Sequence, residues 1–233
     1  MSAATLFDLD GTLLDTPSGI ARAIHEVLAE LGAPPAPEDR VRATIGRPLV
    51  GVFATLLGQP EDHRDVLHAA ERFRVLFREQ VVPTARDLVF PGVTALLADL
   101  RADGRALAVV TSKIRASAEE LLTAAGLTEH FDAVVCHGMA ERGKPHPDLA
   151  LLAADRLSVA PEECVVVGDA VDDVRMAVAA RMDAVGVGYG VAEPEQLRAA
   201  GARTVAATVA ELREALGLAA PAPATTSVPS AAG

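Results

Sequence analysis

Two aspartates, Asp8 and Asp10, stand one residue apart where a short apolar stretch ends near the start of the chain. Because successive side chains of a strand point to opposite faces, these two carboxylates share one face and Phe7 and Leu9 take the other. Two such charges are costly to hold together unless a cation, a shared proton or hydrogen bonds compensate them. Gly11 then permits a sharp turn. The pattern indicates either a strand that ends in a simple Asp-Gly turn or a site built around paired carboxylates.

Three further segments carry polar side chains that could act with this pair. The Thr111 hydroxyl follows an apolar run and can donate to an anion, which the N–H groups at a following helix start can also bind. Lys144, between a glycine and a proline, supplies positive charge from a constrained loop. Asp169 offers a carboxylate that could ligate a metal or cap a helix. The segments are Thr111-Ser112-Lys113, Gly143-Lys144-Pro145-His146-Pro147-Asp148 and Gly168-Asp169-Ala170-Val171-Asp172-Asp173.

Apolar runs of strand length alternate with helical stretches along most of the chain. Continuous β-branched runs are typical of strands buried on both faces, and their alternation with helices indicates a parallel sheet of right-handed βαβ units. In such sheets ligands bind beyond the carboxyl ends of the strands, where Asp8, Thr111 and Asp169 fall. The predicted strands are 5–7, 107–110, 133–136, 164–167 and 184–187, and the predicted helices are 93–101, 115–125, 147–157 and 172–180.

Residues 16–90 interrupt this alternation, because they show helical spacing and no strand pattern. We therefore predict an α/β fold in which residues 1–15 and 91–217 form a Rossmann-like core with a doubly wound parallel sheet. A small helical cap domain is inserted at 16–90. The tail 218–233, rich in Ala, Pro, Thr and Ser, is predicted to be disordered. The helices predicted in the insertion are 18–31, 47–57 and 62–79.

The composition argues against several classes of protein. Of the 233 residues only 3% are aromatic, and the net charge is -11, so a nucleic acid would find neither stacking platforms nor a basic surface. No apolar run approaches the ~20 residues that cross a bilayer, and no basic leader is present. Cys136 and Cys164 lie in apolar stretches, which favours buried reduced thiols. We predict a soluble cytoplasmic monomer or homodimer that binds neither nucleic acid nor membranes.

In their order and on this strand pattern, the four segments resemble the four motifs of the haloacid dehalogenase (HAD) superfamily. The chain is most similar to the phosphoglycolate phosphatase-type branch, in which a helical cap follows the first motif. The resemblance covers residues 4 to about 216. It implies a Mg²⁺-dependent phosphatase, since phosphoryl transfer requires mainly positioning and charge neutralisation.

The resemblance implies distinct roles for the two opening aspartates. Asp8 would be the nucleophile that forms an aspartyl-phosphate, and Asp10 the general acid and base. Mg²⁺ would be held by the carboxylates of Asp8 and Asp169 and by the backbone carbonyl of Asp10. Dehalogenation needs neither a metal nor a second acid, so the Asp10 side chain and the acidic fourth motif favour phosphatase chemistry.

The remaining matched residues would bind and orient. Thr111 and Lys144 are expected to hold the phosphoryl group and assist catalysis, and Ser112, where related sequences often carry Asn, to bind substrate. Lys113 either contacts substrate or faces water. Asp173, four residues after Asp169, is expected to orient a metal-bound water or Lys144. Its neighbour Asp172 is interpreted as a solvated residue at a helix start, and Ala170 lacks the hydroxyl that often follows the metal-binding aspartate.

The cap is expected to select the substrate by closing over it. Arg47, in a predicted loop between cap helices, could bind a carboxylate or a second phosphate of the substrate, although a solvated loop explains it equally well. We predict a small phosphorylated metabolite, with phosphoglycolate or a similar ester as the leading class. An inorganic pyrophosphatase and a sugar-phosphate mutase would use the same machinery. A catalytically silent binding module is the alternative outside enzymes.

Overall fold

The structure is a computed structural model that describes residues 2–218. In this part of the chain six strands form one parallel sheet in the order β3-β2-β1-β4-β5-β6. The first strand is therefore central. The strands β2 and β3 lie on one side of it, and β4, β5 and β6 lie on the other. The strands are β1 (Ala4–Phe7), β2 (Ala106–Thr111), β3 (Ala133–Cys136), β4 (Cys164–Gly168), β5 (Asp183–Val187) and β6 (Thr204–Ala206).

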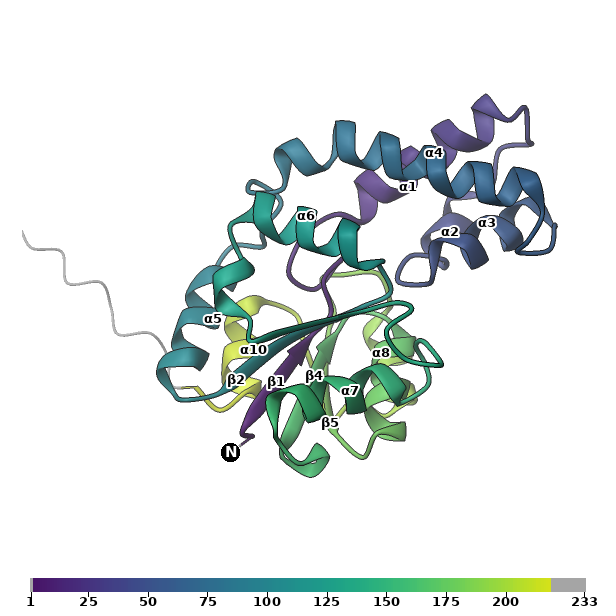
Figure 1. The fold of residues 1–233 in the computed structure, drawn as a ribbon. Coiled ribbons are helices and arrows are strands. Elements are labelled where there is room, and N and C mark those ends of the chain that lie inside the picture. The colour runs from purple at the N-terminus through teal and green to yellow at the C-terminus, as the bar shows by residue number, and fades with distance from the viewer. Residues whose placement is uncertain (1, 219–233) are drawn as a thin grey trace, which may run out of the picture.

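Helices cover both faces of this sheet (Figure 1). Alternate residues of β1 point to opposite sides. Leu6 belongs to the buried cluster that includes residues of α7, α8 and α9, whereas Phe7 belongs to the cluster that includes residues of α5, α6 and α10. The predicted α/β fold with a doubly wound parallel sheet is confirmed. The helices are α5 (Val93–Ala102), α6 (Arg115–Ala125), α7 (Asp148–Leu157), α8 (Val171–Ala179), α9 (Pro194–Ala200) and α10 (Val209–Ala215), with short 3-10 turns η2 (Thr128–His130) and η3 (Pro161–Glu163).

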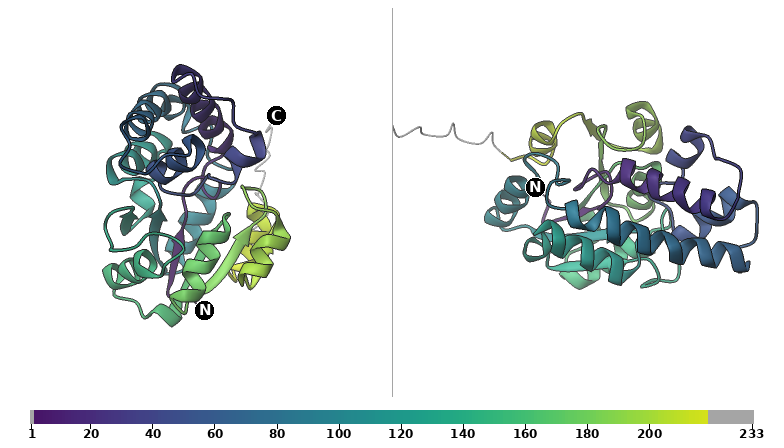
Figure 2. Two further views of the ribbon diagram at one scale, coloured as in Figure 1. Left: turned by 90° about the vertical axis from the view of Figure 1, so that its right-hand side faces the viewer. Right: turned by 90° about the horizontal axis from the view of Figure 1, so that it is seen from above.

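A separate helical layer lies beyond the carboxyl ends of the strands, as Figure 2 shows from the side. The helical layer consists of α1 (Pro17–Glu30), α2 (Glu38–Arg42), α3 (Leu49–Leu57) and α4 (Arg64–Gln80). The short 3-10 turn η1 (Val82–Thr84) follows it. The longest two helices, α1 and α4, pack against each other, and Ile24 of α1 and Phe73 of α4 are buried. The boundaries predicted for a cap domain stay a prediction.

The differences from the predicted elements have local causes. The helix expected over 47–57 begins only at Leu49, because Pro48 lies just before it in an extended conformation. Strand β6 and helices α2, α9 and α10 were not predicted, since segments of three to seven residues carry little periodicity. Cys136 and Cys164 are buried and free, as expected. The disorder predicted for the tail concerns residues outside the described part, except for 218.

Among the described helices, none combines the length and the apolar character that crossing a membrane requires.

Candidate active site

The central position of β1 brings the predicted residues to one edge of the sheet. Asp8 follows β1 directly, and its N–H donates to the Val167 carbonyl of β4 at 2.9 Å. Asp169 follows β4, and Thr111 ends β2 on the other side of β1. Asp8, Asp169 and Thr111 are all buried. Side chains that are far apart in sequence thus meet where parallel α/β sheets bind ligands.

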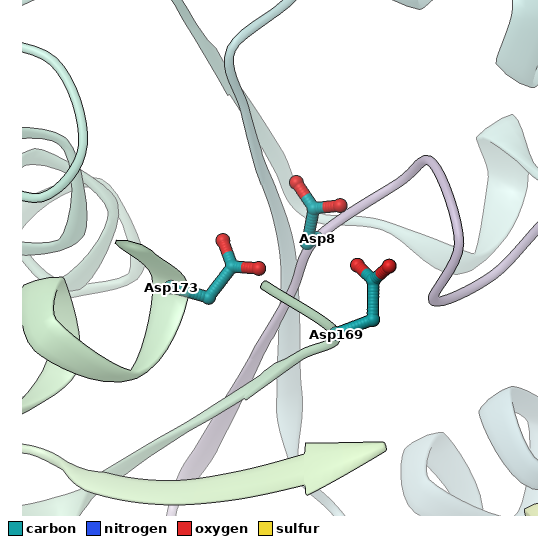
Figure 3. A group of neighbouring side chains, drawn as sticks. All are labelled: Asp8, Asp169 and Asp173. Carbon is teal, nitrogen blue, oxygen red and sulfur yellow. The ribbon is translucent and has the colours of Figure 1, made fainter. Parts of the chain in front are cut away.

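Asp8 is held by a buried ion-pair network. The Nζ atom of Lys144 lies 2.5 Å from Asp8 Oδ1 and 2.6 Å from Asp173 Oδ1. Carboxylate oxygens of Asp8, Asp169 and Asp173 lie within 4.8 Å of one another. Figure 3 shows the three carboxylates gathered around the end of β1. One ammonium group therefore pairs with two of three neighbouring carboxylates, and Asp169 is left without it.

The pKa values reflect this imbalance of charge. Burial, together with the carboxylates of Asp173 and Asp10, raises the pKa of Asp8 to about 7, although Lys144 opposes the shift. Burial, then Asp8 and Asp173, raises the pKa of Asp169 well above its usual range. Burial lowers the pKa of Lys144, but Asp173 and Asp8 outweigh that effect and the net pKa is raised. The lysine stays charged, and Asp8 and Asp169 need further positive charge to ionise together.

Asp169 is positioned by neutral donors. The Thr12 hydroxyl donates to its Oδ1 at 3.1 Å, and the Val191 N–H donates to its Oδ2 at 2.8 Å. The backbone also closes in around it, because a Cβ atom on Gly11 would lie 2.1 Å from Asp169 Oδ2, and one on Gly190 would lie 2.3 Å from Asp169 Cβ. Gly11 in addition has φ +82°, a conformation that favours glycine. Neither position accommodates a side chain while Asp169 keeps its place.

This donor set fits a hard divalent cation. Within residues 2–218 Asp169 has no ion-pair partner, and Lys144 alone offsets the charge of Asp8 and Asp173. Mg²⁺ prefers carboxylate and carbonyl oxygens and commonly binds through one or two carboxylates. Asp8 and Asp169 are the carboxylates that would hold it, with the Asp10 carbonyl nearby in sequence.

The Asp10 side chain is held by partners other than those of this cluster. The Thr16 hydroxyl donates to Asp10 Oδ1 at 2.6 Å, and Lys113 Nζ lies 3.1 Å from Asp10 Oδ2. The same ammonium lies 4.0 Å from the ring centroid of Phe77 in α4. Thr16 directly precedes α1. Each carboxylate oxygen of Asp10 is therefore held by a residue that borders or contacts the helical layer.

Thr111 ends β2, and the helix that follows it begins at the predicted residue. The hydroxyl oxygen of Thr111 accepts the Lys113 N–H at 3.2 Å, which leaves the hydroxyl proton available for an anion. The next helix, α6, spans the predicted range Arg115–Ala125, so three residues separate Thr111 from its start. Ser112 Oγ is buried without a hydrogen-bond partner.

The fold and these motifs have counterparts among known proteins. Over residues 5–187 the chain matches the family described as haloacid dehalogenase-like hydrolase. The chain belongs to the HAD-like hydrolases. It is 44% identical over 212 residues to a Dickeya dadantii protein named probable phosphatase IndB, with 91% of this chain and 92% of that protein covered.

Two further HAD relatives cover most of the chain. A phosphoglycolate phosphatase of Escherichia coli (strain K12) is 32% identical over 230 residues, which covers 91% of both proteins. A hydrolase from Pseudomonas syringae, known from its crystal structure, superimposes with a TM-score of 0.82 at 26% identity and covers 92% of this chain and 98% of its own. The HAD resemblance read from the four motifs is confirmed.

A cavity of about 290 Å³ lies between the HAD core and the helical layer. Asp10, Ser112 and Lys113 line it from the core, and Arg47 lines it from the loop between α2 and α3. Arg47 does not stand free: its Nε atom lies 3.7 Å from Asp172 Oδ2, with the arginine side chain 55% exposed and the aspartate 20%. Asp172 is therefore an ion-pair partner of Arg47 rather than a fully solvated residue.

Several contacts in this HAD site escaped the sequence analysis. The 186–190 segment shows a glycine pattern that evokes a nucleotide-binding loop, yet it contributes Gly190 beside Asp169 and ends next to the Val191 N–H. Thr16 gave no signal, because a threonine before a helix is ordinary. Lys113 could have been assigned by its place at the end of β2, near the edge where Asp10 lies, but its direction depends on tertiary packing.

Proposed function

We propose that the protein is a Mg²⁺-dependent phosphatase that hydrolyses a small phosphomonoester through an aspartyl-phosphate on Asp8. The observation that carries this proposal is the buried cluster of three carboxylates at the end of β1, of which one lysine pairs with two. An anionic nucleophile can approach a phosphate only where positive charge is concentrated. The phosphatase names of relatives at 44% and 32% identity support the same reaction class.

The residues divide the reaction into two displacements. Asp8 attacks phosphorus, the bond from phosphorus to the ester oxygen breaks, and Asp10 gives its proton to the departing alcohol. A water molecule then gives a proton back to Asp10 and attacks phosphorus, the bond to Asp8 breaks, and inorganic phosphate leaves. Lys144 stays charged and steadies Asp8, while the Thr111 hydroxyl and the N–H groups of residues 112–113 bind the phosphoryl oxygens in this proposal. Asp173 orients Lys144 at 2.6 Å.

Mg²⁺, when bound, would neutralise charge between the carboxylates and the phosphoryl group. Asp8, Asp169 and the Asp10 carbonyl are the ligands we assign to it. The pKa of Asp169, raised well above its usual range by burial and by its acidic neighbours, supports the need for such a cation.

The helical layer would act as the cap of this enzyme. Arg42 in α2 donates to the carbonyl of Gly190 at 2.7 Å, beside Asp169. Gly46 lies close to Ala170, because a Cβ atom on it would be 3.4 Å from the Ala170 methyl group. Contacts of this kind let the layer close over a substrate and exclude water. The predicted division into core (1–15 and 91–217) and cap (16–90) is consistent with this role.

The geometry supports the reaction class more strongly than it supports phosphoglycolate as substrate. The Escherichia coli relative is named for that ester. Arg47, the residue proposed to bind its carboxylate, is already paired with Asp172. Pyrophosphate hydrolysis and phosphoryl transfer between sugar oxygens would use the same cluster, so they remain the competing reactions.

The test is release of inorganic phosphate by purified protein from a panel of phosphomonoesters, pyrophosphate and a sugar phosphate, with and without EDTA. We expect Mg²⁺-dependent release from monoesters and none from Asp8→Asn. Release from pyrophosphate alone would replace the proposal with a pyrophosphatase, and isomerised sugar phosphate without release would replace it with a mutase. Release that EDTA does not affect would contradict the metal-dependent mechanism.

A further inference from the structure

The cavity beneath the helical layer receives the leaving group if the proposed function holds. Asp10, the residue assigned to protonate the departing oxygen, lines it, whereas Asp8, Lys144 and Asp169 do not. The phosphoryl group therefore lies outside the cavity, and the alcohol part of the ester extends into it. The polarity and charge of the cavity wall then indicate which kind of alcohol binds there.

The helical layer contributes an apolar part of the wall, beside the polar side chains described below. Ile20 and Ile24 come from α1, Val52 comes from α3, and Phe73 and Phe77 come from α4. The two phenyl rings stack with centroids 5.8 Å apart and planes at 25°. A group that fills this space gains the free energy of burying apolar surface, whereas a charged group loses its hydration there.

The cations around the cavity are already paired with carboxylates. Arg74 Nη1 lies 2.8 Å from Glu71 Oε2, and Arg78 Nε lies 2.8 Å from Glu120 Oε1. Lys113 pairs with Asp10, and Arg47 with Asp172, as described above. The other titratable side chain of the wall, His137, is exposed. A carboxylate on the substrate would meet cations whose charge is offset by their own partners.

The size of the cavity limits the size of the alcohol that can fill it. Its volume is about 290 Å³. It lies just below the ~300–1,000 Å³ typical of pockets for drug-sized ligands. A two-carbon acid would leave most of the apolar wall against water, and one ring with a short linker would cover it.

We infer that the preferred substrate is a phosphomonoester of an uncharged, largely apolar alcohol about the size of one ring, and not a phosphorylated small acid such as phosphoglycolate. This inference rests on the proposed function, since it concerns the leaving group of the same reaction.

The test compares four primary esters at saturating Mg²⁺: benzyl phosphate, 4-carboxybenzyl phosphate, ethyl phosphate and phosphoglycolate. The first two differ by one carboxylate, and the first and third by the ring. We expect kcat/KM for benzyl phosphate to exceed that for each of the others by at least about 10-fold. Equal or faster hydrolysis of phosphoglycolate or of the 4-carboxybenzyl ester would overturn the inference and leave the phosphatase assignment intact.

Variants of the wall sharpen this result. Phe73→Leu is expected to lower the ratio of benzyl to ethyl kcat/KM by about 3- to 10-fold, and this ratio is insensitive to the amount of folded enzyme. Leu67→Ala, on the same helix but 50% exposed, is the matched control and should not change the ratio. An unchanged ratio in Phe73→Leu would place the ring elsewhere and overturn the inference.

Charge is tested separately with Glu120→Gln, which removes the partner of Arg78. We expect the ratio of 4-carboxybenzyl to benzyl kcat/KM to rise about 2- to 5-fold, a small change because the pair is partly solvated. Glu119→Gln, which affects only the exposed pair with Arg115, is the control. A ratio that does not rise would contradict the role given to paired cations.

Failure of the proposed function is distinguishable from failure of this inference. If wild type and Asp8→Asn released phosphate equally slowly from every ester, the reaction class would be wrong. Calorimetric binding of benzyl and 4-carboxybenzyl phosphate to the Asp8→Asn variant would still report the preference of the cavity. Tighter binding of the carboxylated ester there would overturn the inference without any turnover.

Discussion

The two aspartates near the start of the chain each pair with a lysine, but in different surroundings. Asp8 and Lys144 lie almost fully buried among core elements, with Asp173 as a third partner. Asp10 pairs with Lys113, whose ammonium also lies over Phe77 of the helical layer. The first pair is therefore built by the sheet and its loops alone, and the second depends on how the helical layer is placed.

This difference separates two parts of the proposed reaction. The group that attacks phosphorus is fixed by the core, where the substrate always presents the same phosphoryl group. The group that handles the proton of the leaving alcohol is tied to the layer whose cavity holds that alcohol. Substrate choice and proton transfer can then be linked, because a misplaced helical layer would disturb Asp10 before it disturbed Asp8.

Asp8→Asn is the substitution with the largest expected effect on activity. The amide cannot form the aspartyl-phosphate, so phosphate release should fall by on the order of 10⁴-fold or more. The variant should keep the wild-type circular dichroism spectrum, because it removes a buried charge from a crowded cluster. The control is Asp15→Asn, which makes the same change from carboxylate to amide in the same segment, at a residue outside the described ion pairs. Substantial residual turnover would show that another group attacks phosphorus.

Gly190→Ala tests the core pair through its geometry. The new Cβ atom would lie 2.3 Å from Asp169 Cβ, so either the 190–191 loop or the aspartate has to move. We expect kcat to fall by about 10–100-fold and the Mg²⁺ concentration for half-maximal activity to rise. Disturbing groups that orient metal ligands has effects of this size. Gly188→Ala in the same loop meets the Pro194 ring at 3.3 Å and should affect stability more than the need for metal. An unchanged Mg²⁺ dependence in Gly190→Ala would argue against Asp169 as a ligand.

The sequence was sufficient to predict that Asp8, Thr111 and Asp169 meet at one edge of the sheet, for a physical reason. Asp8, Thr111 and Asp169 end or follow apolar strands, and a parallel sheet brings such ends together regardless of loop detail. The cavity could not be predicted in this way. Its wall depends on which faces of α1, α3 and α4 turn toward the core, and helical periodicity does not distinguish packing within a layer from packing against a ligand. The ion pair of Arg47 with Asp172 likewise depends on how the two parts are placed.

Lys113→Met tests the second pair. Methionine can keep the apolar contact with Phe77 but removes the ammonium 3.1 Å from Asp10 Oδ2. We expect kcat for alkyl esters to fall by about 10-fold, a fraction of the 10²–10⁴-fold that general acid catalysis contributes. The loss should be smaller for 4-nitrophenyl phosphate, whose leaving group departs without a proton. Lys113→Arg should recover much of the activity, and equal losses for both kinds of ester would mean that Lys113 acts on binding alone.

The smallest effect concerns pH and separates the two pairs by their charge. Burial raises the pKa of Asp8 to about 7, so in metal-free protein the free energy of unfolding should fall as the pH rises from about 4, its unfolded value, through 7. Mg²⁺ binds the ionised form and should offset this loss. At 5 mM Mg²⁺ the thermal midpoint should therefore rise more at pH 8 than at pH 5.5, by several degrees for a stabilisation difference of about 1–2 kcal/mol.

Asp8→Asn should weaken this pH dependence of the Mg²⁺-induced shift, while Lys113→Met should leave it intact, because Asp10 contributes a backbone carbonyl and not its carboxylate to the assigned metal site. Asp169, whose pKa is also raised, acts in the same direction and leaves part of the dependence in the Asp8 variant. Differential scanning fluorimetry measures the thermal midpoint of each protein at pH 5.5 and at pH 8, with and without Mg²⁺. An equal shift at both pH values in the wild type would mean that Asp8 binds the metal without losing a proton, and that Lys144 alone keeps it ionised.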